Sequence, residues 1–338
     1  DNVSVIDLLH FRLERNIPVG KGPTGVAVNP QKNEVYVVNS DSANVSVIDA
    51  ETNTVTFTLG VHGRPFFIDV SQDGKRGYVA NSGSANVSVL DLEQHKVIAT
   101  IGVGGKPGLA RVSPDGKIVV VTNRDGNSVS LIDADRLVVR ATLPVCQAPE
   151  QIAILPDSAK AFVSCSASNQ VAAIDLKNAA VLALLDVGKT PISLTLKPDG
   201  GQLFVENYDS QSISDINTQT NEVGGTYLIG QQPVRGVASA DNSLLYVSNY
   251  GSDSVALYSI DNGKVAGSVP VGAKPDALAL TPNQLYLLVC DTGAGDVAVV
   301  RTRVTTTNVP VLLTLVPVGR EPRQIAVKNF MLRKPPRP

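Results

Sequence analysis

Short runs in which apolar residues alternate with small polar residues recur along the whole chain, separated by turns rich in Gly, Pro, Asn, Asp and Ser. One unit of the pattern contains four such runs, at 25–28 (GVAV), 35–39 (VYVVN), 44–49 (NVSVID) and 55–61 (VTFTLGV). Alternation bounded by turn residues predicts half-buried β-strands joined by tight turns. Each unit therefore predicts a four-stranded antiparallel sheet, and we name its runs A, B, C and D in chain order.

The last residue of run B shows the period of the repeat. It falls at seven positions, each 42 residues after the one before: Asn39, Asn81, Asn123, Cys165, Asn207, Asn249 and Asp291. A fixed period of this length, made of strand runs, is typical of a β-propeller, in which similar sheets surround a central channel. We expect the Asn residues at these positions to hydrogen-bond nearby loop backbone and to serve the framework rather than a ligand.

Counting the copies favours eight blades, with seven as the alternative. Run C and the Pro that introduces run A each occur eight times, whereas run B occurs seven times. We therefore expect an all-β, single propeller domain over 1–330, closed by pairing of the C-terminal A strand with the N-terminal C–D hairpin. The missing B strand would lie upstream of Asp1, or this blade would have three strands. Residues 331–338 (MLRKPPRP) form a basic, Pro-rich tail.

Composition narrows the function classes. The net charge of -2 and the pI of about 6.0 argue against a nucleic-acid partner, and no apolar run reaches the length of a membrane span. The chain opens with Asp in the middle of a repeat, so we expect a processed, secreted protein. CxxCH, GxSxG, P-loop and HExxH motifs are absent from the sequence, and its three His are scattered. These observations predict no catalytic set, no metal site and no cofactor.

The amino-acid sequence of the repeat resembles that of a known family. The segment VTN at 121–123, with YVVN, YVAN and YVSN variants, is followed by NVSVID-like and VGxxP segments and is similar to the YVTN β-propeller repeat. The resemblance covers nearly the whole chain, although the fourth repeat (VSCSAS) and the fifth (SISDIN) depart from the pattern. It implies a propeller related to archaeal surface-layer proteins, to periplasmic or secreted bacterial propellers and, more distantly, to propellers that carry d1 haem or act as lactonases. Haem d1 would depend on His62 alone, so we expect none.

The D–A and B–C loops of a propeller share one face, at the mouth of the channel. The D–A loops and the strand entrances of this chain carry eight cations: Lys21, Arg64, Lys106, Lys189, Arg235, Lys274, Arg320 and Arg323. Converging cations raise the local potential and attract an acidic or anionic ligand. The alternative is that these side chains only aid solubility and are neutralised by B–C loop acids, namely Asp41, Asp125, Asp209, Asp253 and Asp296.

Four residues are expected to form two pairs. Asp69 and Arg111 occupy equivalent positions in neighbouring A runs, where other repeats have small residues, and predict an inter-blade ion pair near the channel. A structural role is favoured over a catalytic one, because an unpaired buried charge is costly. Cys146 and Cys165 map to one face of adjacent strands and predict a disulfide, with a two-thiolate metal site as the alternative. Cys290 is expected to be a buried free thiol.

Together these observations favour an extracellular, periplasmic or cell-surface propeller that acts as a binding platform without catalysis. Its D–A loop face would meet a partner protein or an acidic ligand. The runner-up is a channel-mouth hydrolase or lyase of the lactonase type that uses Asp69, Arg111 and Arg64. A third possibility is a structural accessory module of a redox or surface-layer assembly.

Overall fold

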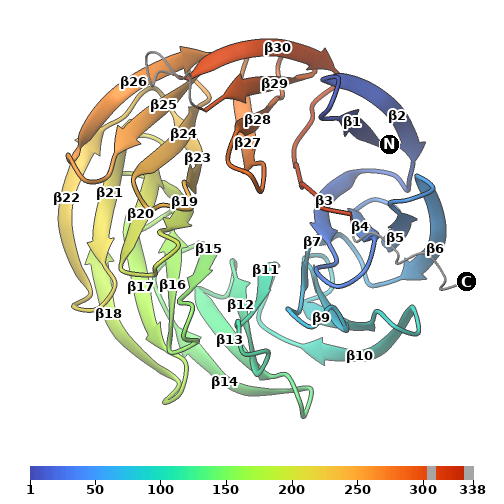
Figure 1. Cartoon of the computed structure of the whole chain (residues 1–338). Coiled ribbons are helices and arrows are strands. Elements are labelled where there is room, and N and C mark those ends of the chain that lie inside the picture. Colours follow the sequence, from blue (N-terminus) through green and yellow to red (C-terminus); the bar gives the residue numbers. More distant parts are fainter. Residues whose placement is uncertain (303–309, 331–338) are drawn as a thin grey trace, which may run out of the picture.

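The computed structural model describes residues 1–302 and 310–330, and within them every regular element is a β-strand. Seven four-stranded sheets and one two-stranded sheet stand around a common centre (Figure 1). All strand pairs of the four-stranded sheets are antiparallel, as in β4 with β5 and β5 with β6. The described residues contain no helix long and apolar enough to cross a membrane. The sheets confirm the all-β propeller that the alternation of apolar and polar residues predicted.

Each four-stranded sheet contains its strands in chain order, from the channel outward. The first strands are β3 (Pro23–Val28), β7 (Pro65–Val70), β11 (Pro107–Val112), β15 (Pro149–Ile154), β19 (Pro191–Leu196), β23 (Pro233–Ala238) and β27 (Pro275–Leu280). The second strands are β4 (Glu34–Asn39), β8 (Arg76–Asn81), β12 (Ile118–Asn123), β16 (Lys160–Cys165), β20 (Gln202–Asn207), β24 (Leu244–Asn249) and β28 (Tyr286–Asp291). The third strands are β5 (Asn44–Asp49), β9 (Asn86–Asp91), β13 (Ser128–Asp133), β17 (Gln170–Asp175), β21 (Ser212–Asn217), β25 (Ser254–Ser259) and β29 (Asp296–Arg301). The fourth strands are β6 (Thr54–Gly60), β10 (Lys96–Gly102), β14 (Val138–Pro144), β18 (Ala180–Asp186), β22 (Glu222–Leu228), β26 (Lys264–Pro270) and β30 (Val311–Pro317).

The core lies between neighbouring sheets. The second and third strands of each sheet are buried on both faces, whereas the outer fourth strand alternates between exposed and buried residues. Tyr36 and Val47 of one sheet pack in a single cluster with Ile68 and Leu90 of the next. Close packing of thin sheets, roughly 10 Å apart, needs mainly aliphatic side chains, which explains how a chain with 4% aromatic residues fills its core.

The Asn at the end of the second strand ties that strand to the third. Asn39 Nδ2 donates hydrogen bonds to Asn44 Oδ1 at 2.8 Å and to Ser46 Oγ at 2.9 Å. In the third sheet, the Asn123 oxygen also accepts a bond from the Gly104 N–H at 3.1 Å. The framework role is as predicted, but most of the acceptors are side chains of the third strand rather than loop backbone.

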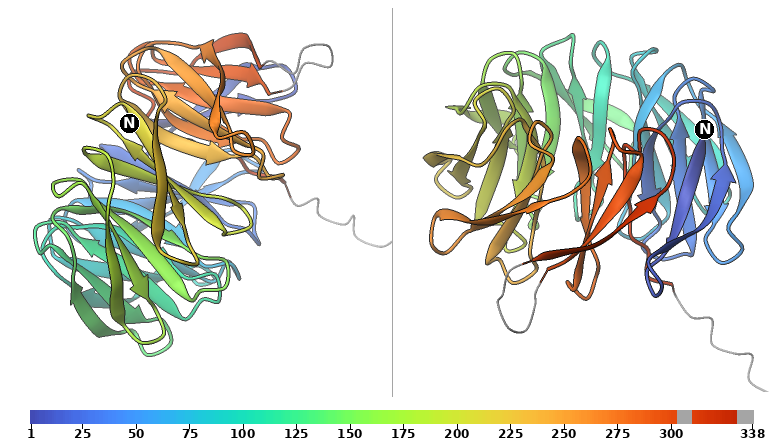
Figure 2. Two further views of the ribbon diagram at one scale, coloured as in Figure 1. Left: turned by 90° about the vertical axis from the view of Figure 1, so that its left-hand side faces the viewer. Right: turned by 90° about the horizontal axis from the view of Figure 1, so that it is seen from above.

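The ring is closed differently from the prediction. β1 (Asn2–Asp7) and β2 (Arg12–Pro18) form a two-stranded sheet, and β2 lies against β30 and β6, as outer strands of neighbouring sheets do elsewhere. In the right-hand view of Figure 2, these N-terminal strands (dark blue) lie next to the red strands of the last sheet. The described residues contain seven complete blades, so the preference for eight is not supported and the alternative of seven is.

The expected pairing of the C-terminal A strand with the N-terminal hairpin is also wrong. Residues 318–330 run from β30 toward the channel (Figure 1), but they form no strand. The physical reason is that a run B would have to lie between this segment and β1, so the two backbones have no ladder to share. The tail predicted at 331–338 lies outside the described residues.

Candidate functional site

The D–A loops, which join the fourth strand of one sheet to the first strand of the next, pack directly against the B–C loops, which join second and third strands. The N–H of Thr292 donates to the carbonyl of Lys274 at 3.0 Å, and the N–H of Gly293 donates to the carbonyl of Ala273 at 2.9 Å. The same bond joins Ser40 to Gly22 at 2.8 Å in the first sheet. Both loop sets therefore lie on one face of the ring, as expected.

The D–A loops share a backbone feature that the sequence analysis did not predict. It determines the direction in which the side chains of the loop cations project. The residue before the entrance Pro has a positive φ in every repeat, at Gly22, Arg64, Lys106, Ala148, Thr190, Gln232, Lys274 and Glu321. The left-handed region costs a non-Gly residue about 1–2 kcal/mol, so the loop must hold it in place. One such restraint is the Lys274 N–H, which donates to Asp253 Oδ1 at 2.8 Å. Gly, which adopts this conformation without strain, occupies the position only in the first repeat, at Gly22.

The eight predicted cations divide into two groups. Lys106 lies 3.7 Å from Asp125, Arg235 lies 3.6 Å from Asp276, and Arg323 lies 2.6 Å from Glu321. Five form no ion pair with any described residue: Lys21, Arg64, Lys189, Lys274 and Arg320. Of the B–C loop acids expected to neutralise the ring, only Asp125 forms such a pair within the described part of the chain. Most cations and most acids of this face therefore form no close ion pair with each other among the described residues.

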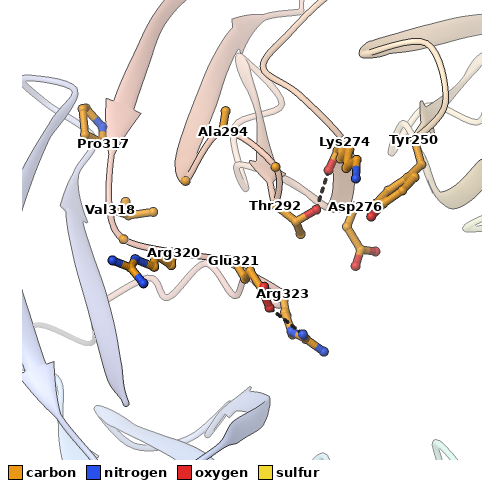
Figure 3. Close-up of a pocket in the computed structure, with 13 residues that line it drawn as sticks. Tyr250, Lys274, Asp276, Thr292, Ala294, Pro317, Val318, Arg320, Glu321 and Arg323 are labelled. Carbon is orange, nitrogen blue, oxygen red and sulfur yellow. Dashed lines mark hydrogen bonds and ion pairs between the residues drawn. The ribbon is translucent and has the colours of Figure 1, made fainter.

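A cavity of about 850 Å³ opens on this face where the last sheets meet the C-terminal segment (Figure 3). We call it the rim pocket. It is lined by side chains from β27, from the loops after β24, β26 and β28, and from the segment after β30. These side chains include Tyr250, Lys274, Asp276, Thr292, Arg320 and Arg323. Three of the eight predicted cations thus line one pocket, while the others lie elsewhere around the ring.

The pocket combines cations with an aromatic ring and one carboxyl. Lys274 Nζ lies 5.7 Å from the centre of the Tyr250 ring, and Thr292 Oγ1 donates to the Lys274 carbonyl at 2.7 Å (Figure 3). Burial raises the pKa of Asp276, an effect that Arg235 and Arg323 partly oppose. Such a lining can hold a ligand that carries an acidic group beside an apolar or planar part.

Asp69 and Arg111 meet, as predicted, but outside the rim pocket. Arg111 Nη1 lies 3.1 Å from Asp69 Oδ1, and the Val112 N–H donates to Asp69 Oδ2 at 2.9 Å. The Arg111 guanidinium also lies over the Phe67 ring, at 4.5 Å. These contacts tie β7 to β11, and Arg64, the third residue of the suggested hydrolase set, is exposed and forms no ion pair with them.

The cysteines follow the expected pattern. Cys146, in the loop before β15, and Cys165, at the end of β16, form a disulfide with a Cα–Cα distance of 5.6 Å. Their sulfurs are therefore not free to act as thiolate ligands. Cys290 is free and buried, and burial raises the pKa of its thiol. Within 1–302 and 310–330, no group of three or more His, Cys, Asp or Glu residues could hold a metal ion.

The sequence analysis did not predict a buried pair of acids, Asp291 and Asp296. Asp291 is fully buried at the end of β28, where most repeats have Asn, and Asp296 takes the place of Asn44. Burial, followed by the neighbouring Asp296, raises the pKa of Asp291 to about 8, while the Gly272 N–H, which donates to Oδ2 at 3.0 Å, opposes the shift. We therefore expect Asp291 to hold a proton at neutral pH, beside Asp296. The sequence did contain a signal for this pair, because position 291 has Asp where most repeats have Asn.

Glu206 is the second buried acid that sequence reasoning missed. It is the penultimate residue of β20, where the first two sheets have Val38 and Ala80. Thr195 Oγ1 donates to its Oε1 at 2.8 Å, whereas Oε2 has no hydrogen-bond partner among the described residues. Burial raises the pKa of Glu206 to about 7. A Glu in a row of mostly small or aliphatic residues could have been recognised from the repeat alignment.

Two family models match parts of the chain. A YNCE-like beta-propeller model matches residues 14–113, and a model described as lactonase, 7-bladed beta-propeller, matches residues 234–322. Each match covers less than half of the chain. Among curated protein sequences, none matches.

Solved structures show the same architecture. Hydrazine synthase of Kuenenia stuttgartiensis aligns with a TM-score of 0.66 and 21% identity, over 84% of this chain and 97% of that one. A functionally unknown protein of Desulfotomaculum acetoxidans aligns with a TM-score of 0.69 and 17% identity, over 87% and 98%. At these identities the likeness concerns the fold alone. The chain is a β-propeller with seven complete blades and an added two-stranded sheet, and parts of it are similar to YNCE-like and lactonase propellers.

Proposed function

We propose that this propeller is a binding module without catalysis, which holds an acidic segment of a partner protein in the rim pocket. One observation carries the proposal. Lys274 and Arg320 line a cavity of about 850 Å³, are exposed, and have no ion-pair partner among the described residues. Arg235 and Arg323, in contrast, are already paired with acids.

The pocket offers a carboxylate both charge and shape. Charge-assisted hydrogen bonds from Lys or Arg are about twice as strong as neutral ones, and they gain strength where water is excluded. The Tyr250 ring supplies a flat apolar wall, and Gly293 and Gly295 leave the loop backbone open to a ligand. An extended acidic peptide would place a Glu or Asp carboxylate between Lys274 and Arg320 and rest its neighbouring side chains on this wall.

The test compares two double variants that remove the same charge. K274A/R320A removes the free cations of the pocket, and R64A/K189A removes two unpaired cations from the same kind of loop outside it. Binding of a fluorescein-labelled peptide of alternating Glu and Ser is followed by fluorescence anisotropy. Since a hydrogen bond to a charged group contributes about 1.5–3 kcal/mol, the pocket variant should bind at least tenfold more weakly.

The control variant shows whether a loss of peptide affinity is specific to the rim pocket. R64A/K189A should change the Kd less than about twofold, because rim charges act mainly through screened long-range attraction. Equal losses in both variants would mean that the whole ring, rather than the pocket, attracts the peptide. Wild-type affinity in the pocket variant would refute the proposed site.

We place the protein in an extracellular, periplasmic or cell-surface compartment. The Cys146–Cys165 disulfide supports this placement, because such bonds persist in oxidising compartments. The compartment is tested by fractionating the source cells and probing each fraction for the chain. Recovery in the cytoplasm alone, with both cysteines reduced, would contradict it.

Hydrolysis of a lactone is the second candidate, favoured by the lactonase match over 234–322, which contains most of the rim pocket. Asp69 and Arg111 lie outside that match and are engaged with each other, so Asp276 is the carboxyl best placed to act as a base. A pH-stat assay with simple aliphatic lactones tests this candidate. Turnover above the buffer rate that is lost in D276N would support it, and turnover no faster than buffer would reject it.

A further inference from the structure

The buried acid pair adjoins the rim pocket. Asp291 ends β28, Asp296 begins β29, and residues 292–295, which lie between them, all line the pocket. The N–H groups of Ala294 and Gly295 donate to the Asp291 carbonyl at 3.2 and 2.9 Å, which holds this loop in a tight turn. The two acids therefore stand at the base of the loop that forms one wall of the pocket (Figure 3).

The loop that carries Lys274 is bonded to the first of these acids. The N–H of Gly272, two residues before Lys274, donates to Asp291 Oδ2 at 3.0 Å. A Cβ atom at position 272 would lie only 2.6 Å from that oxygen, so the carboxyl and the loop backbone are in close contact. A change of charge on Asp291 therefore acts directly on the loop that holds Lys274.

The segment that carries Arg320 is bonded to the other end of the same wall. The N–H groups of Val318 and Gly319 donate to the Gly295 carbonyl at 3.1 and 3.2 Å. Gly295 immediately precedes Asp296, and Gly319 immediately precedes Arg320. Both free cations of the rim pocket thus stand on segments that are hydrogen-bonded to the loop between the two acids.

The acid pair has no hydrogen-bond donor of its own. In the first sheet, Asn39 Nδ2 donates to Asn44 Oδ1 at 2.8 Å. Asp291 and Asp296 occupy these two positions in the last sheet and lie opposite each other in the ladder. The Oδ1 atom of each has no hydrogen-bond partner among the described residues. Without a proton, two negative charges would therefore lie side by side in a buried place.

Other charged groups surround the pair. Asp253, whose Oδ1 accepts the Lys274 N–H, is a third acid that disfavours a charge on Asp291. Burial raises the pKa of the adjacent Cys290 thiol, which stays uncharged. Burial also raises the pKa of Asp276, so this carboxyl is a second group whose titration the experiment must separate. The remaining charges of the pocket lining are Lys274, Arg320, Glu321 and Arg323.

We propose that the acid pair makes binding in the rim pocket depend on pH, so that the pocket holds an acidic segment tightly while Asp291 is protonated and more weakly once it is charged. The inference rests on the proposed function. A charge added at a buried position acts on its neighbours more strongly than it would in water. On Asp291 it would oppose a ligand carboxylate at Lys274 and Arg320 and repel Asp296. Since the pKa of Asp291 is raised to about 8, the change should fall between about pH 7 and pH 9.

The test measures the Kd of an acetylated peptide of alternating Glu and Ser at pH 6, 7, 8 and 9, at constant ionic strength. The peptide carries tetramethylrhodamine, and binding is followed by fluorescence anisotropy. The Glu side chains and the Lys and Arg of the pocket keep their charges over this range. D291N restores the Asn of other repeats and cannot titrate, and D276N removes the other carboxyl with a raised pKa.

The wild-type Kd should rise by at least about threefold from pH 6 to pH 9, and that of D276N should rise equally. The Kd of D291N should stay constant within about 1.5-fold. Because coupling is reciprocal, binding to the wild type at pH 8 should also take up protons, which calorimetry in two buffers of different ionisation enthalpy measures. If D291N fails to fold, proton uptake by D276N decides, since Asp291 is the group with a raised carboxyl pKa that remains beside the pocket.

Three results would overturn the inference. Binding of the peptide with a pH-independent Kd would refute the pH control and leave the proposed function intact. A rise in Kd that persists in D291N, or that disappears in D276N, would assign the effect to a different group. Absence of peptide binding at every pH would refute the proposed function, and the inference with it.

Discussion

Replacing Asp291 by Asn tests whether the buried acid pair shares a proton. In most of the other repeats an Asn at this position donates its amide to the third strand, as Asn39 does to Asn44. The amide introduced by D291N would donate in the same way to the Asp296 carboxylate. The variant therefore keeps the shape and the hydrogen bond of the site but removes the proton that the two carboxyls share.

The size of the effect follows from the shifted pKa. The pKa of Asp291 is raised from 3.8 to about 8 in the folded chain, so between these values the folded state binds a proton that the unfolded state has lost. Stability that is present below about pH 4 is then lost as the pH rises toward 8, by about 1.4 kcal/mol per pH unit. D291N has no such proton. The unfolding free energy of D291N minus that of the wild type should therefore grow by about 3 kcal/mol between pH 5 and pH 7.

Urea unfolding at pH 5, 6, 7 and 8 measures this difference, because titrations common to both proteins cancel at each pH. D41N is the control, since Asp41 is an exposed acid in the equivalent loop of the first sheet. Its unfolding free energy should run parallel to that of the wild type. A difference between D291N and the wild type that does not change with pH would refute the shared proton.

Three further variants test other contacts. Replacing Cys146 and Cys165 together by Ser should cost about 3 kcal/mol, because the disulfide closes a loop in the unfolded chain, and differential scanning fluorimetry should show a lower Tm than for the wild type. D69A leaves the Arg111 guanidinium without its acid and should cost about 1–2 kcal/mol in urea unfolding; an unchanged midpoint would mean that the pair contributes nothing. E206Q removes a carboxyl whose pKa is raised to about 7, so the wild type, but not the variant, should lose stability from this site as the pH rises from about 4.5 to 7.

The repeat made most of the fold predictable, because local alternation and turn chemistry agree in every unit. The number of blades was harder to predict. Eight copies of run C suggested eight blades, but a blade also needs a second strand, and the described residues contain only seven. The count of one run therefore overestimated the number of complete sheets.

The candidate site was predictable only in part. The shared face of the loops and the positions of Lys274 and Arg320 follow from the repeat. Which cations are paired does not, because the partner can come from a different element of the next sheet, as Asp276 of β27 does for Arg235 of β23. The rim pocket could not be predicted from the sequence either, because it forms where loops of several sheets meet the C-terminal segment.

Departures from the repeat separate the charges that the fold compensates from those that it leaves available. Seven sheets of one design need the same framework residues, so a charge present in only one sheet must find its partner locally. Asp69 pairs with Arg111 in the next sheet, and burial beside Asp296 raises the pKa of Asp291, which favours its uncharged form. Lys274 and Arg320 find no acid in the described residues although they line a cavity, so their charges are free to act on a ligand from outside.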